Sequence, residues 1–197
     1  MRSLRLCFSG FGAVGQRFAK LLLERKDELE TQYNLYITVT GISTPSRGTL
    51  INPHGLNLAV LLAQQETHHG FDRADEGFRA CDVAKMLDIV EADIFCEMST
   101  LSIKDGEPAT SYIEKAFSKG MHVITTNKGP EAHHYRRLKT MADERRLAYL
   151  FETAVMDGAP VFNFAQECLR GCRISRIPDR CTYIFFLAML PREHCRL

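Results

Sequence analysis

The feature that most constrains the fold is a glycine-rich run near the N-terminus, which reads Gly10, Phe11, Gly12, Ala13, Val14 and Gly15. It follows the apolar segment Leu4–Ser9, which is typical of a buried strand. It opens the segment Ala13–Lys26, where apolar residues recur at helical spacing. A G-x-G-x-x-G pattern alone is a weak signal, but between a strand and a helix it indicates a dinucleotide-binding turn.

Each glycine has a distinct physical role in such a turn. Gly10 is expected to form the tight turn, Gly12 to let a pyrophosphate approach the backbone, and Gly15 to let the helix pack closely on the strand. The N-terminus of the helix would then offer unpaired N–H groups and a positive dipole end to the phosphates. A glycine turn that binds no ligand is the alternative interpretation.

Strand and helix patterns alternate along the chain that follows. The expected strands are Leu35–Ile42, Ala92–Met98, His122–Thr126 and Leu147–Phe151. The expected helices are Leu56–Gln65, Val83–Leu87, Pro108–Ser118 and Glu131–Arg146. The Gly-, Pro- and Ser-rich segment Ser43–Gly55 is expected to be a long loop. This order predicts an α/β fold, namely a Rossmann-type doubly wound parallel sheet with helices on both faces.

The alternation changes character after Thr153, which predicts a domain boundary there. We expect a dinucleotide-binding domain over residues 1–152 and the start of a second, α+β domain over residues 153–172. Residues 173–197 form a tail that fits neither pattern.

The end of the second expected strand bears on the choice of dinucleotide. An NAD site usually places Asp or Glu there to bind the ribose 2′-hydroxyl. The segment 35–65 contains no carboxylate and offers Arg47 among several hydroxyl side chains instead. A guanidinium can bind a 2′-phosphate, which a carboxylate would repel. NADP(H) is therefore favoured and NAD(H) stays the alternative, as does a simple loop cation for the role of Arg47.

A second polar turn, Thr125–Pro130, lies between an expected strand and an expected helix and contains Lys128. Ligands of open α/β sheets bind at this edge, so Lys128 can reach a cofactor and a substrate. Asn127 can fix the turn by side-chain-to-backbone hydrogen bonds. Most lysines are merely solvated, which is the alternative for Lys128.

Composition limits the class of protein. The formal net charge is +1, which gives no electrostatic reason to expect nucleic acid or a membrane surface as a partner. The longest apolar stretch, Tyr183–Leu190, is far shorter than a membrane span. The seven cysteines show no extracellular spacing pattern and favour a reducing cytoplasm.

Five motifs in order resemble the N-terminal half of homoserine dehydrogenase. They are the glycine run, Glu97–Thr100, Gly106–Ala109, Thr126–Pro130 and Glu152–Pro160, within a resemblance that extends from about residue 4 to about residue 172. The resemblance implies NADPH- or NADH-dependent reduction of L-aspartate 4-semialdehyde to L-homoserine, on the route to threonine, methionine and isoleucine. It also implies a homodimer, in which the second domain supplies substrate binding and dimer contacts.

The resemblance also implies roles for individual residues. Phe11 to Val14 would contact the dinucleotide, and Ser99 and Thr100 would lie at its nicotinamide end. Lys128 would hold the cofactor and the substrate. A monovalent cation, usually sodium, would be bound by backbone carbonyls of Glu152, Val155, Asp157 and Ala159.

The chain departs from the family pattern after Cys172. The family continues into a G-T-x-N segment and then the aspartate and lysine that bind substrate and move the proton, whereas Arg173–Leu197 contains no such match. Hydride transfer to an aldehyde needs a proton donor, so we expect this chain to turn over aspartate semialdehyde poorly. Besides an oxidoreductase, the sequence leaves open an NADP-binding module without turnover and a non-functional fragment.

Overall fold

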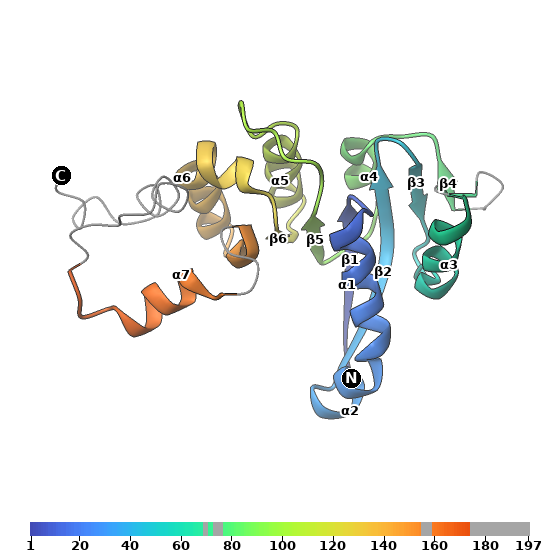
Figure 1. Ribbon diagram of the computed structural model, residues 1–197, viewed down its shortest axis with the longest axis horizontal. Coiled ribbons are helices and arrows are strands. Elements are labelled where there is room, and N and C mark those ends of the chain that lie inside the picture. Colours follow the sequence, from blue (N-terminus) through green and yellow to red (C-terminus); the bar gives the residue numbers. More distant parts are fainter. Residues whose placement is uncertain (69–70, 73–76, 155–158, 174–197) are drawn as a thin grey trace.

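The structure is a computed structural model that describes residues 1–68, 71–72, 77–154 and 159–173. Its centre is a seven-stranded sheet in the order β4-β3-β2-β1-β5-β6-β7 (Figure 1). The strands are β1 Arg2–Ser9, β2 Leu35–Thr44, β3 Gly48–Ile51, β4 Phe78–Arg79, β5 Ile94–Glu97, β6 His122–Thr125 and β7 Tyr149–Leu150. The pairing is parallel between β2 and β1, β1 and β5, β5 and β6, and β6 and β7, as the alternating pattern predicted.

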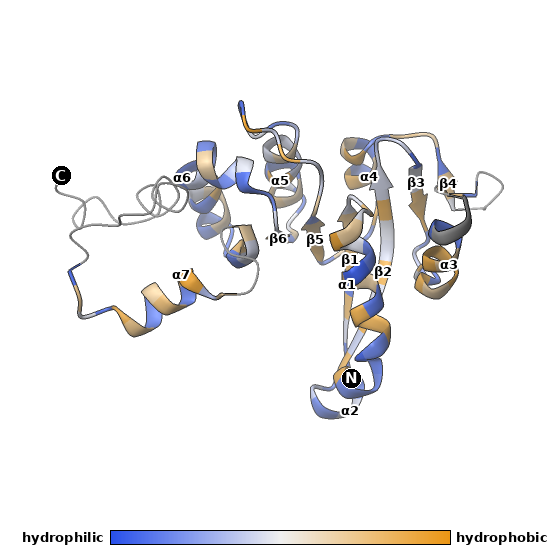
Figure 2. Cartoon of the chain, viewed as in Figure 1, coloured by the Kyte–Doolittle hydropathy of each residue, from blue (hydrophilic) through white to orange (hydrophobic). Residues whose placement is uncertain are grey.

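Helices cover both faces of the sheet. They are α1 Ala13–Glu24, α2 Lys26–Gln32, α3 Leu58–His68, α4 Val83–Ile89, α5 Ala109–Ser118, α6 Lys128–Glu144 and α7 Val161–Asn163, with a 3-10 turn η1 at Glu152–Ala154 and a π-helical turn η2 at Phe164–Cys168. One apolar core lies beneath α1 and α3 and contains Phe8, Ile42 and Leu61. A second lies beneath α4, α5 and α6 and contains Phe95 and Ile113. Figure 2 shows polar and apolar residues alternating along α1, as expected for a helix half-buried on a sheet.

The expectation of a long loop over Ser43–Gly55 is wrong. Strand β2 continues to Thr44, and β3 returns antiparallel to it, with Thr44 opposite Gly48. The hydroxyls of Ser43 and Thr49 are 2.7 Å apart, and Thr49 donates to the Cys81 carbonyl at 2.7 Å. These hydrogen bonds allow hydroxyl side chains to be buried in a strand, which composition alone could not reveal. The α/β fold class is confirmed, but β3 and β4 make one edge of the sheet antiparallel.

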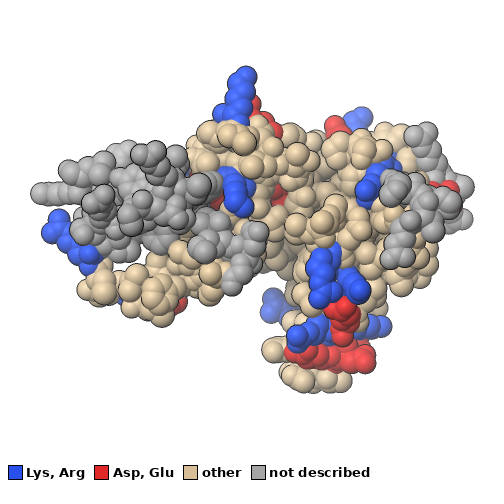
Figure 3. All heavy atoms as spheres, in the orientation of Figure 1, with Lys and Arg blue, Asp and Glu red and all other residues tan. Residues whose placement is uncertain are grey.

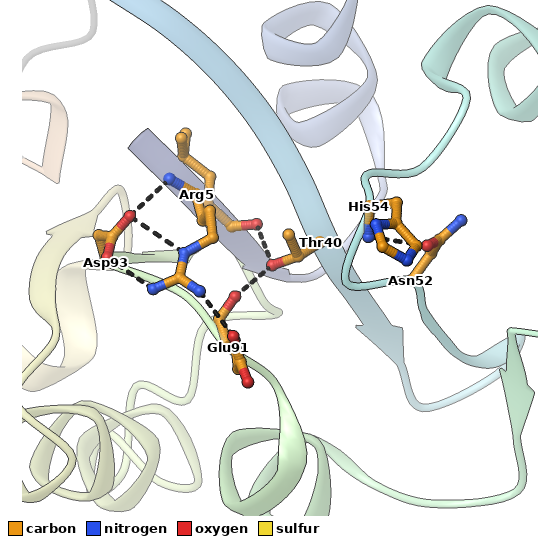
Figure 4. Close-up of polar contacts among 7 residues, drawn as sticks. Arg5, Thr40, Asn52, His54, Glu91 and Asp93 are labelled. Atoms are coloured by element: carbon orange, nitrogen blue, oxygen red, sulfur yellow. Dashed lines mark hydrogen bonds and ion pairs between the residues drawn. The ribbon is translucent and has the colours of Figure 1, made fainter. Parts of the chain in front are cut away.

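Arg5 in the middle of β1 contacts the segment that leads into β5 (Figure 4). Its backbone N–H and its guanidinium both donate to Asp93, the backbone at 2.8 Å, and Nη1 donates to Glu91 at 2.7 Å. Thr40 of β2 donates to the Glu91 carbonyl at 2.8 Å. These contacts fix β1, β2 and the segment before β5 at the edge of the sheet away from the glycine run.

Charged side chains on the α1–α2 end of the molecule alternate in sign (Figure 3). The ion pairs there are Arg17–Glu24 at 3.0 Å, Arg25–Glu28 at 2.6 Å and Lys26–Glu30 at 3.9 Å. They form a mixed-charge surface, consistent with the net charge of +1. Among the described residues, no helix has the length and apolar character that crossing a bilayer requires.

Candidate functional site

Four turns meet at the carboxyl edge of the sheet, after β1, β2, β5 and β6. The first is the glycine run, where Gly10 has a φ of +92° and donates its N–H to the Ser43 carbonyl at 2.9 Å. A Cβ on Gly15 would lie 2.9 Å from the Gly10 carbonyl oxygen, so this glycine lets α1 pack against the turn as the sequence predicted. Gly12 is exposed at the N-cap of α1, and a Cβ there would meet nothing within 4 Å. The turn therefore leaves open space over the first N–H groups of α1.

The other residues of the run divide between core and surface. Ala13 and Val14 are exposed in the first turn of α1, with Val14 53% exposed. Phe11 is 1% exposed, and its ring packs against Phe71 with centroids 6.1 Å apart. A ligand above the helix N-terminus can therefore contact the side chains of Ala13 and Val14, but only the backbone of Phe11.

The second turn, Pro45–Arg47, joins β2 to β3. It contains Arg47, the residue predicted to bind the 2′-phosphate of the cofactor. Arg47 is half-buried, and its Nη1 donates to the Phe11 carbonyl at 3.0 Å and to the Gln65 side chain. A guanidinium has five N–H donors in all, so these contacts through one nitrogen are compatible with binding an anion as well. The structure thus places Arg47 directly beside the glycine run.

A cavity of about 510 Å³ opens beside this turn. Its lining residues include Ser43, Thr44, Ser46, Arg47 and Tyr112, together with the acidic Asp82. Hydroxyl donors beside a cation suit a phosphorylated sugar, and the cavity is large enough for a nucleoside.

The third and fourth turns, after β5 and β6, meet around the carboxylate of Glu97. Ser99 donates to it from its backbone N–H at 2.9 Å and from its hydroxyl, and Thr125 Oγ1 donates at 3.1 Å. Asn127 N donates to Thr125 Oγ1 at 3.0 Å, and Asn127 Oδ1 accepts from Gly129 N at 3.1 Å at the start of α6. The structure therefore brings predicted residues Ser99 and Lys128 to the same edge, with Thr100 exposed beside them.

Helix α6 begins at Lys128, one turn earlier than the predicted start at Glu131. The Asn127 side chain caps this extra turn, which makes Lys128 its first residue. Gly129 faces Gly106 closely, because a Cβ on Gly129 would lie 2.8 Å from the Gly106 Cα. Close backbone packing thus joins the loop after β5 to the helix that carries Lys128.

A buried acid–phenol pair lies under the same helix. Glu131 is fully buried, and the Tyr149 hydroxyl lies 2.6 Å and 2.8 Å from its two carboxylate oxygens. The pKa of Glu131 is raised to about 8, chiefly by burial and also by the charge of Glu97, while the hydrogen bond from Tyr149 lowers it. Glu131 therefore holds a proton at neutral pH.

This raised pKa predicts a pH-dependent stability. Because the folded-state pKa lies above the unfolded value, the stabilisation is complete below about 4.5 and is lost as pH rises towards about 8. Glu131→Gln should remove up to about 1.4 kcal/mol per pH unit of that slope, since the amide imitates the protonated acid. Urea unfolding at several pH values tests this, with the exposed Glu91→Gln as control. An unchanged slope in Glu131→Gln would show that Glu131 is not the titrating group.

The segment predicted to bind a cation is only partly described. The Glu152 carboxylate accepts from Phe162 N at 2.8 Å and from Asn163 N at 3.3 Å, which caps α7. Val155 and Asp157 lie outside the described residues, and Ala159 is the first described residue after them. The contribution of their carbonyls to a sodium site stays a prediction.

Sequence reasoning missed two residues of this edge, Glu97 and Gln65. The sequence singled out Glu97 only as part of the motif Glu97–Thr100. A single glutamate after an apolar run has no characteristic spacing to other residues that would indicate a role. Gln65 contacts Arg47 from α3, eighteen residues away. Its contact depends on how α3 packs beside α1, which the sequence does not display.

Comparison with known proteins now bears on the identity of the chain. No known protein-family profile matches it. It is 33% identical over 175 residues to the NAD(+)-dependent homoserine dehydrogenase of Pseudomonas canavaninivorans. The matched region covers 89% of this chain and 50% of that relative. It is 32% identical over 168 residues to the homoserine dehydrogenase of Methanocaldococcus jannaschii. The matched region covers 85% of this chain and 49% of that relative.

Solved structures agree on the fold. A hyperthermophilic archaeal homoserine dehydrogenase mutant in complex with NADPH superposes with a TM-score of 0.75 at 23% identity, over 88% of this chain and 51% of that chain. The homoserine dehydrogenase of Thermoplasma acidophilum gives 0.73 at 21% identity, over 88% of this chain and 50% of that chain. The chain spans about half the length of the curated relatives it matches. Over most of its length, the chain is homologous to about half of a homoserine dehydrogenase.

Proposed function

We propose that this chain binds NADP(H) and forms the dinucleotide-binding half of a homoserine dehydrogenase. The observation that carries the proposal is the open N-terminus of α1 at Gly12, with Arg47 hydrogen-bonded to the same turn. A pyrophosphate fits over the N–H groups at that helix end, and the adjacent cavity of about 510 Å³ fits the phosphorylated adenosine. The NADPH complex of the archaeal homologue and the NAD(+)-dependent relative support a nicotinamide dinucleotide.

The proposed reaction is reduction of L-aspartate 4-semialdehyde to L-homoserine, a step that leads to threonine, methionine and isoleucine. NADPH, when bound, supplies the hydride for the aldehyde carbon, and a proton must reach the aldehyde oxygen. Gly12 and Arg47 bind and orient the cofactor from its adenosine end. Ser99 and Thr100 face its nicotinamide end, and Lys128 orients the substrate from the start of α6.

The second candidate is a dinucleotide-binding module without turnover, which the unmatched tail favours. Titration of NADPH into the protein, followed by nicotinamide fluorescence, tests binding. Oxidation of NADPH in the presence of aspartate semialdehyde tests the reaction. Binding without oxidation would favour the module, and the absence of any binding would refute both candidates.

Preference for NADPH should depend on Arg47. Arg47→Ala is expected to weaken NADPH binding by about 1–3 kcal/mol, the range for a hydrogen bond to a charged group. Because Arg47 also braces the Phe11 carbonyl, a smaller loss is expected for NADH. Calorimetric titration of both cofactors measures the difference, with Arg25→Ala at the α1–α2 junction as control. Equal losses for NADPH and NADH would mean that Arg47 does not read the 2′-phosphate.

Four further expectations remain predictions. They are a homodimer, a cytoplasmic location, a bound sodium ion and a boundary between domains near residue 152. The side chain of Phe162 in α7 packs edge-on against Phe151 with ring centroids 5.3 Å apart, so the segment after residue 152 contacts the core beneath α4, α5 and α6. The predicted tail over 173–197 falls, from residue 174 onwards, outside the described residues.

A further inference from the structure

We infer that Glu97 is a positioning residue that joins the two turns of the nicotinamide half of the site, the Ser99 loop and the Lys128 turn. The inference rests on the proposed function, because it assigns those turns to the nicotinamide end. It concerns a residue beneath the site, which contacts neither cofactor nor substrate and acts through its neighbours.

The first observation is that both oxygens of the Glu97 carboxylate are engaged. Glu97 is 0% exposed at the last position of β5. Oε1 accepts from the backbone N–H and the hydroxyl of Ser99, and Oε2 accepts from Thr125 Oγ1 at 3.1 Å. The nearby Asn127 side chain also lowers the pKa of the carboxylate. One carboxylate is thus shared by donors from two different turns.

The second observation is that the strands do not need these bonds. Glu97 and Thr125 are already paired in the β5–β6 ladder, and Thr126 N donates to the Glu97 carbonyl at 3.1 Å. Apolar residues such as Phe95 and Val123 fill the adjoining core. Burial raises the pKa of Glu97, because a carboxylate loses hydration there, and the neutral donors offset only part of that cost. Burial of this carboxylate therefore costs free energy, although the pairing of β5 with β6 does not require it.

The contacts instead fix the backbone beyond the strand ends. Asn127 Nδ2 donates to the Ser99 carbonyl at 3.4 Å, and Asn127 Oδ1 accepts from Gly129 N. A continuous set of hydrogen bonds therefore runs from Ser99 through Glu97, Thr125 and Asn127 to the first turn of α6. Because the Ser99 hydroxyl donates to Glu97, its remaining capacity is to accept, which suits the carboxamide N–H group of a nicotinamide.

The adenosine half has separate supports. Its anchors are the Gly12 N-cap and the hydrogen bond of Arg47 to the Phe11 carbonyl. Neither involves Ser99 or Thr125, the residues that donate to the Glu97 carboxylate. Loss of the carboxylate should therefore loosen one end of a bound dinucleotide and leave the other end intact. A general defect in folding would weaken both ends together.

The test compares two ligands in Glu97→Gln. NADPH spans the whole site, and adenosine 2′,5′-bisphosphate covers only the adenosine half. The variant keeps only one accepting oxygen, so its NH2 group must face either the Ser99 donors or the Thr125 donor. We therefore expect NADPH binding to weaken at least about tenfold, with adenosine 2′,5′-bisphosphate unchanged within about twofold. The fluorescence change of the nicotinamide on binding should also decrease. Thr125→Val, which breaks the same connection without altering Glu97, should show a smaller selective loss.

Glu131→Gln is the matched control, because Glu131 is equally buried but bonded to Tyr149. Both ligands should bind it as they bind the unaltered chain. Equal losses of both ligands in Glu97→Gln, or the same selective loss in Glu131→Gln, would overturn the inference. So would unfolding of both Glu97→Gln and Thr125→Val at the assay temperature, which would show a structural role. Failure of the unaltered chain to bind either ligand would instead refute the proposed function.

Discussion

Gly12→Val is expected to weaken NADPH binding by more than about a hundredfold while the protein stays folded. A pyrophosphate over the start of α1 would lose hydrogen bonds to N–H groups, and two such bonds to a charged group account for that factor. The folded state should tolerate the change, because a Cβ at this position meets nothing within 4 Å. The backbone of Gly12 is extended, with φ −81°, so it is not in the left-handed region that favours glycine.

Two measurements separate binding from folding in this variant. Calorimetry gives the affinity for NADPH, and urea unfolding gives the stability, which should change by no more than about 1 kcal/mol at an exposed N-cap. Gly12→Ala, with a smaller side chain, should give an intermediate affinity. Unchanged NADPH affinity in Gly12→Val would place the pyrophosphate elsewhere and remove the main support for the proposed function.

Gly10→Ala is expected to have the opposite signature, a large loss of stability. The φ of Gly10 is +92°, a conformation that costs an L-residue about 1–3 kcal/mol. The added Cβ would also lie 2.3 Å from the carbonyl oxygen of Met98, which is backbone and has no rotamer to relieve the contact. Overpacking of this kind costs a further 1–3 kcal/mol or so, which gives a total of roughly 2–6 kcal/mol.

Gly120→Ala provides a matched control for that prediction. Gly120 has a similar φ of +80°, but a Cβ there would meet nothing within 4 Å. The loss of stability in Gly120→Ala should therefore contain only the backbone contribution, about 1–3 kcal/mol. Urea unfolding of both variants measures the difference. Equal losses would show that the segment around Met98 moves away readily, and that the turn is not held tightly against β5.

The central α/β sheet and the glycine turn could be predicted from the sequence, because both depend on local patterns. Apolar runs such as Leu4–Ser9 and helical spacing in α1 specify the parallel strands and their helices. The hairpin of β2 and β3 was not predicted, because its composition is typical of a loop. Ser43 and Thr49 can be buried there because their hydroxyls bond to each other and that of Thr49 bonds to the Cys81 carbonyl, a partner that is distant in the sequence.

The candidate site shows the same division. The sequence by itself predicted a tight turn at Gly10 and close packing at Gly15, and the structure has a positive φ at Gly10 and a close approach at Gly15. The role of Gly12 towards a pyrophosphate stays a prediction. The sequence also identified Arg47 and Lys128 as cations at turn positions. Only the tertiary structure decided that Arg47 reaches the Phe11 carbonyl. The contact joins residues from separate elements, so no spacing along the chain could reveal it.

The carboxylate of Glu97 is the extreme case. Its neighbours in sequence are ordinary for a strand end, and its partners Thr125 and Asn127 lie about thirty residues away. Parallel pairing of β5 with β6 brings those residues together, and burial then makes each hydrogen bond matter more than it would in water. The sequence predicted the parallel strands of the sheet and a dinucleotide site at the glycine turn. The tertiary structure decided which buried groups hold the Ser99 loop and the Lys128 turn in place, because that depends on the register between strands and on exclusion of water.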